Sequence, residues 1–145
     1  MVDDEAQSTH EALAPQVAQR LYHPNKPHHF MRIKSVKRRI EVRREGVLLA
    51  SSSDALRLLE VGRDIYDPVL YLPAVDVVCR LVRTRRTSHC PLKGDAAYFD
   101  LIDEADSVIE HEIAWSYPDP ISLAAEIKQR IAFYASRVAI QESPL

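Results

Sequence analysis

The chain has 145 residues, of which 46% are hydrophobic and 28% are charged. This length predicts one domain with one core, and the composition is typical of a globular protein, which excludes a disordered or fibrous chain. The net charge of −2 is small, and no apolar run approaches the roughly eighteen residues that span a bilayer. Residues 1–16 are acidic and resemble neither a secretory signal nor a transit peptide, so we expect a cytoplasmic protein without membrane association.

The first predicted element is a short amphipathic helix over residues 9–22, where leucine and valine recur every four residues. Pro15 interrupts this stripe, so we expect residues 1–22 to be an N-terminal extension that is only partly helical. The single domain then comprises residues 23–145.

The segment after this helix contains three histidines, His23, His28 and His29. Imidazoles on a flexible loop can collect zinc or iron. However, the two prolines of the segment favour an extended connector, and adjacent histidines on a strand point to opposite sides. We therefore favour a connector and expect no metal.

Strands are predicted where β-branched and aromatic residues alternate with polar ones or gather in short runs. The segments are 37–44, 47–51, 68–73, 75–84, 107–115, 131–134 and 137–141, together with 53–62 as a strand or irregular turn. Gly46 supplies the turn of a hairpin between the first two. Cys79, inside the fourth, is expected to be a small core residue.

Two further features complete the predicted fold. Alternation in 107–115 places Ile109, His111, Ile113 and Trp115 on one side of a strand, with His111 as a hydrogen-bonded core histidine. Asp119 can cap a short helix, with Pro120 in its first turn. The sequence thus predicts a mainly β domain, α+β at most, with one or two short helices.

The charges are unevenly distributed. Residues 20–44 contain nine Lys and Arg against the single acid Glu41, whereas residues 100–145 contain nine acids against three bases. A basic edge can attract an anionic ligand or nucleic acid. We favour the alternative, that the two charged regions pair with each other across the fold.

Several site classes are not indicated by the sequence. Cys79 and Cys90 are the only cysteines, too few for a disulfide-rich domain or a zinc site built on paired CxxC motifs, so both are expected to be free thiols. The chain has no GxGxxG, GxxxxGK[ST], GxSxG or HExxH motif, and no RRM signature. We expect no cofactor.

The segment "TSHCPLKGDAAY", residues 87–98, gathers reactive side chains. Thr87, His89, Cys90 and Lys93 place a hydroxyl, an imidazole, a thiol and an amine within seven residues. A neighbouring cation favours the thiolate and makes it a better nucleophile. The alternative is a turn in which Cys90 is buried, Lys93 is solvated and Gly94 adopts a positive φ, and spacing alone favours that turn.

This segment, with "YLPAVDV" before it and "AWSYPDP" and "IAFYASRV" after it, resembles the domain-of-unknown-function 427 family, small proteins of bacteria and fungi. The resemblance extends from about His23 to about Gln141. The family pattern falls here on Thr87, Cys90, Pro91, Lys93, Gly94, Tyr98, Trp115 and Tyr117. The common "YYxPxxDV" is only partly matched, at Tyr71, Pro73, Asp76 and Val77.

The resemblance implies a β-tent, or Mss-four-like, fold in which two coiled antiparallel sheets meet at an angle. The natural pocket would then lie between the sheets, lined by Cys90, Lys93, Tyr98, Trp115 and Tyr117. Relatives of this fold often hold zinc with paired CxxC motifs, which this chain lacks. The family is sometimes labelled nucleotidyltransferase-like, but nothing here supplies the paired metal-binding carboxylates of that chemistry.

Three hypotheses for function follow, and none decides whether the protein is an enzyme. The first is a site for a small anionic or aromatic molecule, with Lys93 and Arg80 as anion ligands and Cys90, His89 or Lys93 as catalytic groups. The second is a non-catalytic module, for a ligand or a protein, with an aromatic pocket. The third, least favoured, is nucleic-acid binding through residues 32–44.

The candidate ligand-binding residues are Thr87, Tyr98, Trp115, Tyr117, Arg80 and Tyr71. Trp115 and Tyr117 have an equal claim to be core residues, because alternate positions on a strand share a face. Asp76, Glu60 and Asp95 are candidate acids or bases. A homodimer is compatible with the sequence.

Overall fold

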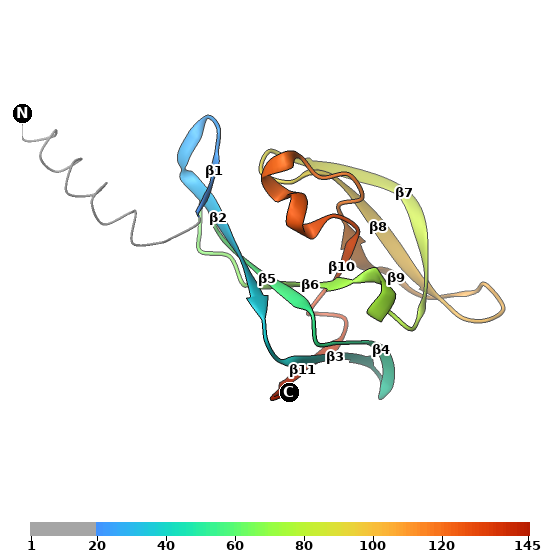
Figure 1. The fold of residues 1–145 in the computed structure, drawn as a ribbon. Helices are drawn as coiled ribbons and strands as arrows, with labels where there is room; N and C mark the ends of the chain where they lie inside the picture. Colours follow the sequence, from blue (N-terminus) through green and yellow to red (C-terminus); the bar gives the residue numbers. More distant parts are fainter. Residues whose placement is uncertain (1–19) are drawn as a thin grey trace, which may run out of the picture.

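The computed structural model describes residues 20–145, in which the regular secondary structure is almost entirely β (Figure 1). Its strands are β1 (Leu21–His23), β2 (Lys26–Val36), β3 (Arg39–Arg44), β4 (Val47–Ser52), β5 (Ala55–Val61), β6 (Val69–Pro73), β7 (Arg80–Cys90), β8 (Gly94–Ile102), β9 (Val108–Ser116), β10 (Arg130–Phe133) and β11 (Ala139–Ser143). Two short 3₁₀ segments accompany them, η2 (Ala74–Asp76) and η3 (Ser122–Ile127). The predicted mainly β class is confirmed.

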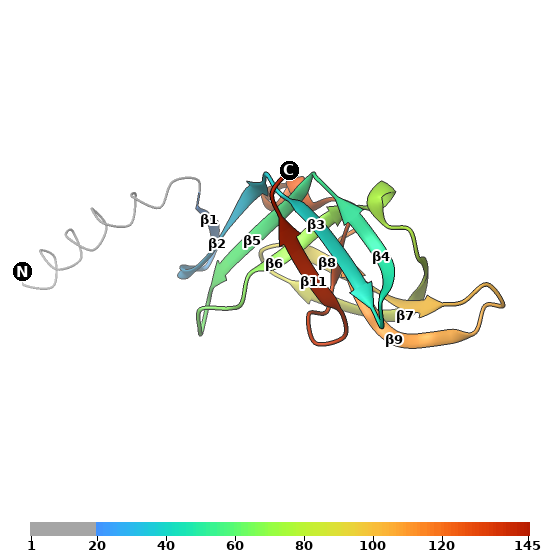
Figure 2. The same ribbon diagram turned by 90° about the horizontal axis from the view of Figure 1, so that it is seen from below.

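The strands form two antiparallel sheets. The larger has the order β1-β2-β5-β6-β10-β9-β8-β7, and the smaller has the order β11-β3-β4. Figure 2 shows the smaller sheet lying across the larger one. In the larger sheet, β1, β2 and β5 form one wing and β9, β8 and β7 form the other. The short strands β6 and β10 join the wings through two residue pairs, Arg130 with Pro73 and Ile131 with Leu72.

The strands at this join bury both faces, because successive side chains on a strand point to opposite sides. Tyr71 and Ala132 point to one face, and Leu72 and Ile131 to the other. On the first face lies the pocket-side core: Met31, Ile33, Leu56, Leu58, Tyr71, Leu92, Ala96, Tyr98, Tyr117, Ala124, Ile127 and Ala132. The second face and the smaller sheet enclose the inter-sheet core: Val36, Ile40, Val42, Leu49, Ala50, Ala55, Leu72, Leu101, Ile113, Ala114, Ile131 and Phe133.

The predicted strands are found, with shifted boundaries. The hairpin around Gly46, which has φ of 79°, joins β3 and β4 as predicted. The strand predicted over 75–84 instead begins at Arg80, after η2, and Cys79 lies just before it, half-buried against the inter-sheet core. The helix predicted over 9–22 falls mainly outside the described residues, and its last two residues belong to β1.

The helix after Asp119 is a correction. The chain forms the 3₁₀ segment η3 there, with Ile121 as its N-cap and no side-chain cap. Asp119 would have capped the amide of Ile121, but that amide donates to the carbonyl oxygen of Lys93 at 2.9 Å. The segment is therefore tied to the β7–β8 turn, and a non-helical backbone at Ala124 breaks it internally.

His111 is a second correction. Its side chain is 78% exposed and contacts Asp100 at 3.3 Å, so it is not a core histidine. The next residue, Glu112, has φ of 46°, and the register between β8 and β9 shifts near this point. A bulge of this kind breaks the alternation on which the prediction depended. Ile113 is buried, whereas Ile109 is exposed.

Candidate functional site

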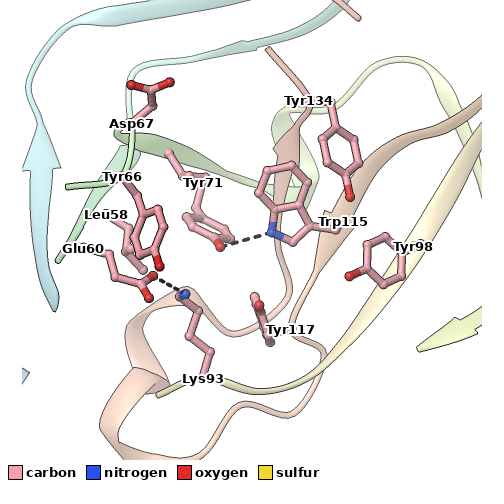
Figure 3. Close-up of a pocket in the computed structure, with 11 residues that line it drawn as sticks. Leu58, Glu60, Tyr66, Asp67, Tyr71, Lys93, Tyr98, Trp115, Tyr117 and Tyr134 are labelled. Carbon is pink, nitrogen blue, oxygen red and sulfur yellow. Dashed lines mark hydrogen bonds and ion pairs between the residues drawn. The ribbon is translucent and has the colours of Figure 1, made fainter. Parts of the chain in front are cut away.

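A pocket of about 230 Å³ lies on the pocket-side face, where the two wings of the larger sheet meet (Figure 3). Side chains reach it from β5, β6, β8 and β9, from the β7–β8 turn, and from the segments that follow β5, β9 and β10. We call it the aromatic pocket, and its lining residues are Leu58, Glu60, Tyr66, Asp67, Val69, Tyr71, Lys93, Tyr98, Trp115, Tyr117 and Tyr134.

Hydroxylated and indole rings dominate this pocket. It contains five of the six tyrosines of the chain and its single tryptophan. Trp115 stands at the centre of the group, with its ring centroid 4.5 Å from that of Tyr134 and edge-on to Tyr71 at 6.3 Å. Its indole N–H donates to the Tyr71 hydroxyl at 3.2 Å. These contacts fix the indole so that one face of the pocket is preformed.

A buried ion pair lies beside the rings. The Lys93 ammonium donates to Oε1 of Glu60 at 2.6 Å, and Nε2 of His29 lies 2.7 Å from Oε2 of the same carboxylate. Burial would raise the pKa of Glu60, but hydrogen bonds from Lys93 and His29 and the Lys93 charge outweigh it and lower that pKa. Glu60 is therefore an anion held between two donors.

The β7–β8 turn explains why Lys93 points inward. The backbone amide of Lys93 donates to the carbonyl oxygen of Cys90 at 3.1 Å, which closes the turn. Pro91 occupies the second turn position, where the fixed φ of proline fits. Leu92 is fully buried in the pocket-side core. Gly94 follows with φ of 111°. The turn predicted from the sequence is thus present, but Lys93 is only 8% exposed, and the expectation that it would be solvated is wrong.

Tyr117 offers a polar group to the pocket. Tyr117 is 7% exposed, and its hydroxyl makes no hydrogen bond to another protein group within residues 20–145. Burial raises the pKa of this hydroxyl most, and the phenols of Tyr71 and Tyr98, the Cys90 thiol and the Glu60 carboxylate raise it further. Tyr117 therefore remains a neutral phenol whose proton is available to a bound molecule.

Comparison with known families identifies the chain. A family model described as a domain of unknown function (DUF427) matches residues 32–143. The chain belongs to the DUF427 family. The match includes every residue of the aromatic pocket and begins after His29. Comparison with curated proteins gave no match.

In this DUF427 chain, six of the residues singled out from the sequence meet in one pocket: Glu60, Lys93, Tyr71, Tyr98, Trp115 and Tyr117. Cys90 lies next to them. Its Sγ is 3.7 Å from the Lys93 ammonium, and its half-buried side chain packs against the pocket-side core, but it does not line the pocket. The pocket itself lies on one bent sheet rather than between the two sheets, because the inter-sheet core fills that space.

Three other predicted residues lie elsewhere. His89 pairs with Asp95 at the surface, at 2.9 Å. Thr87 pairs with Ala97 across the β7–β8 hairpin and is exposed. Arg80 donates to the carbonyl oxygen of Asp103 and to Asp106, away from the aromatic pocket. These three residues are therefore not brought to the pocket with Lys93.

The structure adds three aromatic or charged lining residues that the sequence did not single out, besides the aliphatic Leu58 and Val69. Tyr66 and Asp67 come from the β5–β6 connection, and Tyr134 follows β10. Tyr134 occurs in "IAFYASRV", which contributed to the family resemblance and predicted a strand but was not assigned to a site, and "YDP" at 66–68 carried no motif. The number of tyrosines in the sequence indicates that aromatic residues are available, but only the fold shows that their rings lie together in one pocket.

Tyr98 is held from outside the pocket. Its hydroxyl is 2.6 Å from Oγ of Ser88, and the Arg86 guanidinium lies over its ring at 4.1 Å. Arg86 is itself hydrogen bonded to Glu112. The ring of Tyr98 is thus fixed in position by β7 and β9.

The basic stretch of the chain meets the acidic one. Arg38 pairs with Glu142 at 3.5 Å, and Arg44 pairs with Glu110 at 3.7 Å. Arg57, which lies outside the basic stretch, also binds Glu142. These pairs agree with the interpretation that the two charged regions compensate each other.

Two observations bear on membranes and metals. None of the helical segments within residues 20–145 has the length and apolar character to cross a membrane. In the same part of the chain, no three His, Cys, Asp or Glu side chains gather closely enough to hold a metal ion.

Proposed function

We propose that the aromatic pocket binds a small molecule containing a single ring, held between aromatic side chains and oriented by Lys93 and Tyr117. The observation that carries this proposal is the gathering of five of six tyrosines and the only tryptophan around one buried ion pair. Ligand sites combine an apolar, aromatic lining with a few well-placed polar groups. The proposal requires binding and does not require catalysis.

The size of the pocket limits the ligand. Pockets for drug-sized molecules have volumes of about 300–1,000 Å³. The aromatic pocket, at about 230 Å³, lies below that range. It therefore suits one ring with short substituents better than a whole nucleotide, which argues against reading the nucleotidyltransferase-like label of the family as a description of this pocket.

The charges of the pocket favour a neutral or cationic ring. Lys93 contributes one positive charge, and Glu60 and Asp67 contribute two negative ones, so the formal charge of the lining is −1. Glu60 already neutralises Lys93 by direct contact. Aromatic faces also attract cations through their electron-rich centres. We accordingly revise the anion-binding role expected for Lys93: its ammonium is a hydrogen-bond donor in a paired state.

The first test uses Trp115 as a reporter. Because it is the only tryptophan, any saturable change in tryptophan fluorescence arises at the pocket. We would titrate the full chain with single-ring probes, benzylamine and phenol among them, and confirm hits by calorimetry. We expect saturable quenching. The Tyr117→Phe variant, which removes only the hydroxyl, should weaken binding about fivefold to tenfold, the cost of one hydrogen bond.

The matched control is Tyr22→Phe, since Tyr22 is the one tyrosine outside the pocket. It should bind like the wild type. Cys90→Ala should also keep the ligand, because Cys90 does not line the pocket, whereas Trp115→Ala should lose it when calorimetry is the readout. Equal affinities for Tyr117→Phe, Trp115→Ala and the wild type would contradict the proposal.

A further inference from the structure

A second cavity, of about 530 Å³, adjoins the aromatic pocket on the side of the β1–β2 hairpin. We call it the histidine cavity. It is lined by His23, Lys26, His28, His29, Gly62, Arg63, Tyr66 and Pro91. This lining contains two permanent cations and three imidazoles, with no carboxylate. A concave surface of this charge attracts anions, since low-dielectric walls focus the local potential.

His23 is prepared to donate a hydrogen bond. Its residue is only 9% exposed, and its ring stacks on that of His29 with 5.4 Å between centroids. The amide of Asn25 donates to Nδ1 of His23 at 3.0 Å. Because Nδ1 accepts, the proton of the neutral ring lies on Nε2, which becomes a donor.

Within the part of the chain that the structure describes, the two cations of the cavity have no carboxylate partner. Among residues 20–145, neither Lys26 nor Arg63 has a carboxylate within ion-pair distance, in contrast to Lys93, which Glu60 neutralises. Both cations are exposed at the cavity. His29 differs from them, because its Nε2 already contacts Glu60.

The two cavities share a wall. Tyr66 lines both, and Glu60 of the aromatic pocket holds His29 of the histidine cavity. Gly62 lies under this wall: a Cβ there would be 3.0 Å from the Tyr66 ring and 3.2 Å from the His29 ring. The absence of a side chain at Gly62 allows these two rings to pack over the backbone, where they form the wall that the two cavities share.

We propose that the histidine cavity binds a phosphate group through Lys26, Arg63 and the Nε2–H of His23, and that this phosphate belongs to the molecule whose ring occupies the aromatic pocket. The second half rests on the proposed function. The charges of the two cavities are complementary: the formal charge is −1 around the ring and +2 from Lys26 and Arg63 around the phosphate. The ligand class is thus a ring that carries a phosphate monoester.

The first experiment titrates the full chain with inorganic phosphate and follows the imidazole signals of His23 and His29 by NMR. We expect saturable shifts. Lys26→Gln and Arg63→Gln should each weaken binding about tenfold, the usual effect of losing a charge-assisted contact. The matched controls are Lys37→Gln and Arg83→Gln, exposed cations outside the cavity, and they should bind phosphate like the wild type.

Inorganic phosphate carries no ring, so failure of the aromatic pocket as a ring site would not alter this result. Absence of saturable shifts, or equal weakening by the control variants, would overturn the phosphate site.

The second experiment compares phenyl phosphate with inorganic phosphate by calorimetry. If one molecule occupies both cavities, phenyl phosphate should bind more tightly than inorganic phosphate, and the difference in affinity should disappear in Trp115→Ala. Equal affinities of the two probes would overturn joint occupancy.

Discussion

Single residues set the character of the aromatic pocket, and Lys93 is the most constrained of them. A buried ammonium is stable only when a partner compensates for the loss of water. Glu60 supplies that compensation from 33 positions away in the sequence. The sequence indicated the turn that carries Lys93 and offered Glu60 as one of three candidate acids or bases, but it did not place Glu60 opposite Lys93, so solvent was the natural expectation.

The first residue-scale prediction concerns this pair. Lys93→Met leaves Glu60 with His29 alone, and we expect the free energy of unfolding to fall by about 1–3 kcal/mol, since a half-buried carboxylate loses its main donor. The double variant Lys93→Met with Glu60→Gln should recover part of this loss. Urea unfolding measures both values.

The control for this prediction is Arg80→Met. It breaks the pair of Arg80 with Asp106, whose side chains are 50% and 74% exposed, so stability should change little. An equal loss in Lys93→Met and Arg80→Met would contradict the buried-pair interpretation. So would a double variant less stable than Lys93→Met.

Residue-level inference from the sequence named residues that do line the pocket, such as Lys93, Tyr98 and the half-buried Trp115, and their role there stays a prediction. It went wrong for His89, whose strand position turns it toward Asp95 at the surface. It also placed Arg80 at the site, although this residue lies at the far end of β7 from the turn. Proximity in a motif does not determine on which face of a strand a side chain lies.

At the scale of elements, the β7–β8 turn and η3 position the pocket together. The carbonyl oxygen of Lys93 accepts from Ile121, and Gly94 packs against the backbone that leads into η3. Ala124 and Ile127 of η3 are fully buried in the pocket-side core. The turn, which is local, was predictable from Pro91 and Gly94, but its long-range attachment to residues 120–121 was not.

The element-scale prediction uses two glycines with positive φ. Gly94 has φ of 111°, and a Cβ there would lie 3.2 Å from the backbone nitrogen of Ile121. Gly94→Ala should therefore cost about 2–3 kcal/mol from backbone strain and crowding. Gly46 has φ of 79° with nothing near its absent Cβ, so Gly46→Ala should cost about 1 kcal/mol.

Comparison of the two variants by thermal or urea unfolding isolates the packing contribution, because both replace a positive-φ glycine. If Gly94→Ala were no more costly than Gly46→Ala, the contact between the turn and the segment before η3 would carry no stability. If Gly94→Ala were more costly than Gly46→Ala and also bound a single-ring ligand more weakly, the contact would be linked to the aromatic pocket.

At the scale of the whole molecule, acid stability should report the Glu60 cluster. The pKa of Glu60 is lowered from its ordinary value of 4.5 in the folded chain. Its ionised form therefore stabilises the fold above about pH 4.5, and this contribution is lost as pH falls through the lower, folded-state pKa. Near neutral pH the wild type should be more stable than Glu60→Gln, and the difference should shrink in acid.

The measurement is the free energy of urea unfolding between about pH 3 and about pH 7 for both proteins. If the free energy of unfolding changed with pH in the same way for the wild type and Glu60→Gln, Glu60 would not be the source of the acid sensitivity. A control at Asp95, an exposed carboxylate that is 80% accessible beside His89, separates the buried carboxylate from surface charge in general. We expect Asp95→Asn to follow the wild-type pH dependence.

The mainly β class was predictable for the whole molecule because most strands are short runs with a clear hydrophobic pattern. The sheet order was not, since β6 and β10 are neighbours although more than fifty positions separate them in the sequence. That pairing decides where the pocket lies. It brings Tyr71 of one strand beside Trp115 of another and turns the opposite face toward the smaller sheet.

The join between β6 and β10 has a consequence for motion. Hydrogen-bonded pairing holds the two wings together there at only two positions, and the aromatic pocket takes Leu58 and Glu60 from one wing and Tyr98 and Trp115 from the other. The affinity of the pocket for a molecule that touches both wings therefore depends on the angle between the wings. We expect a bound ring to narrow the range of angles between the wings, which would couple ligand binding to the relative motion of the wings.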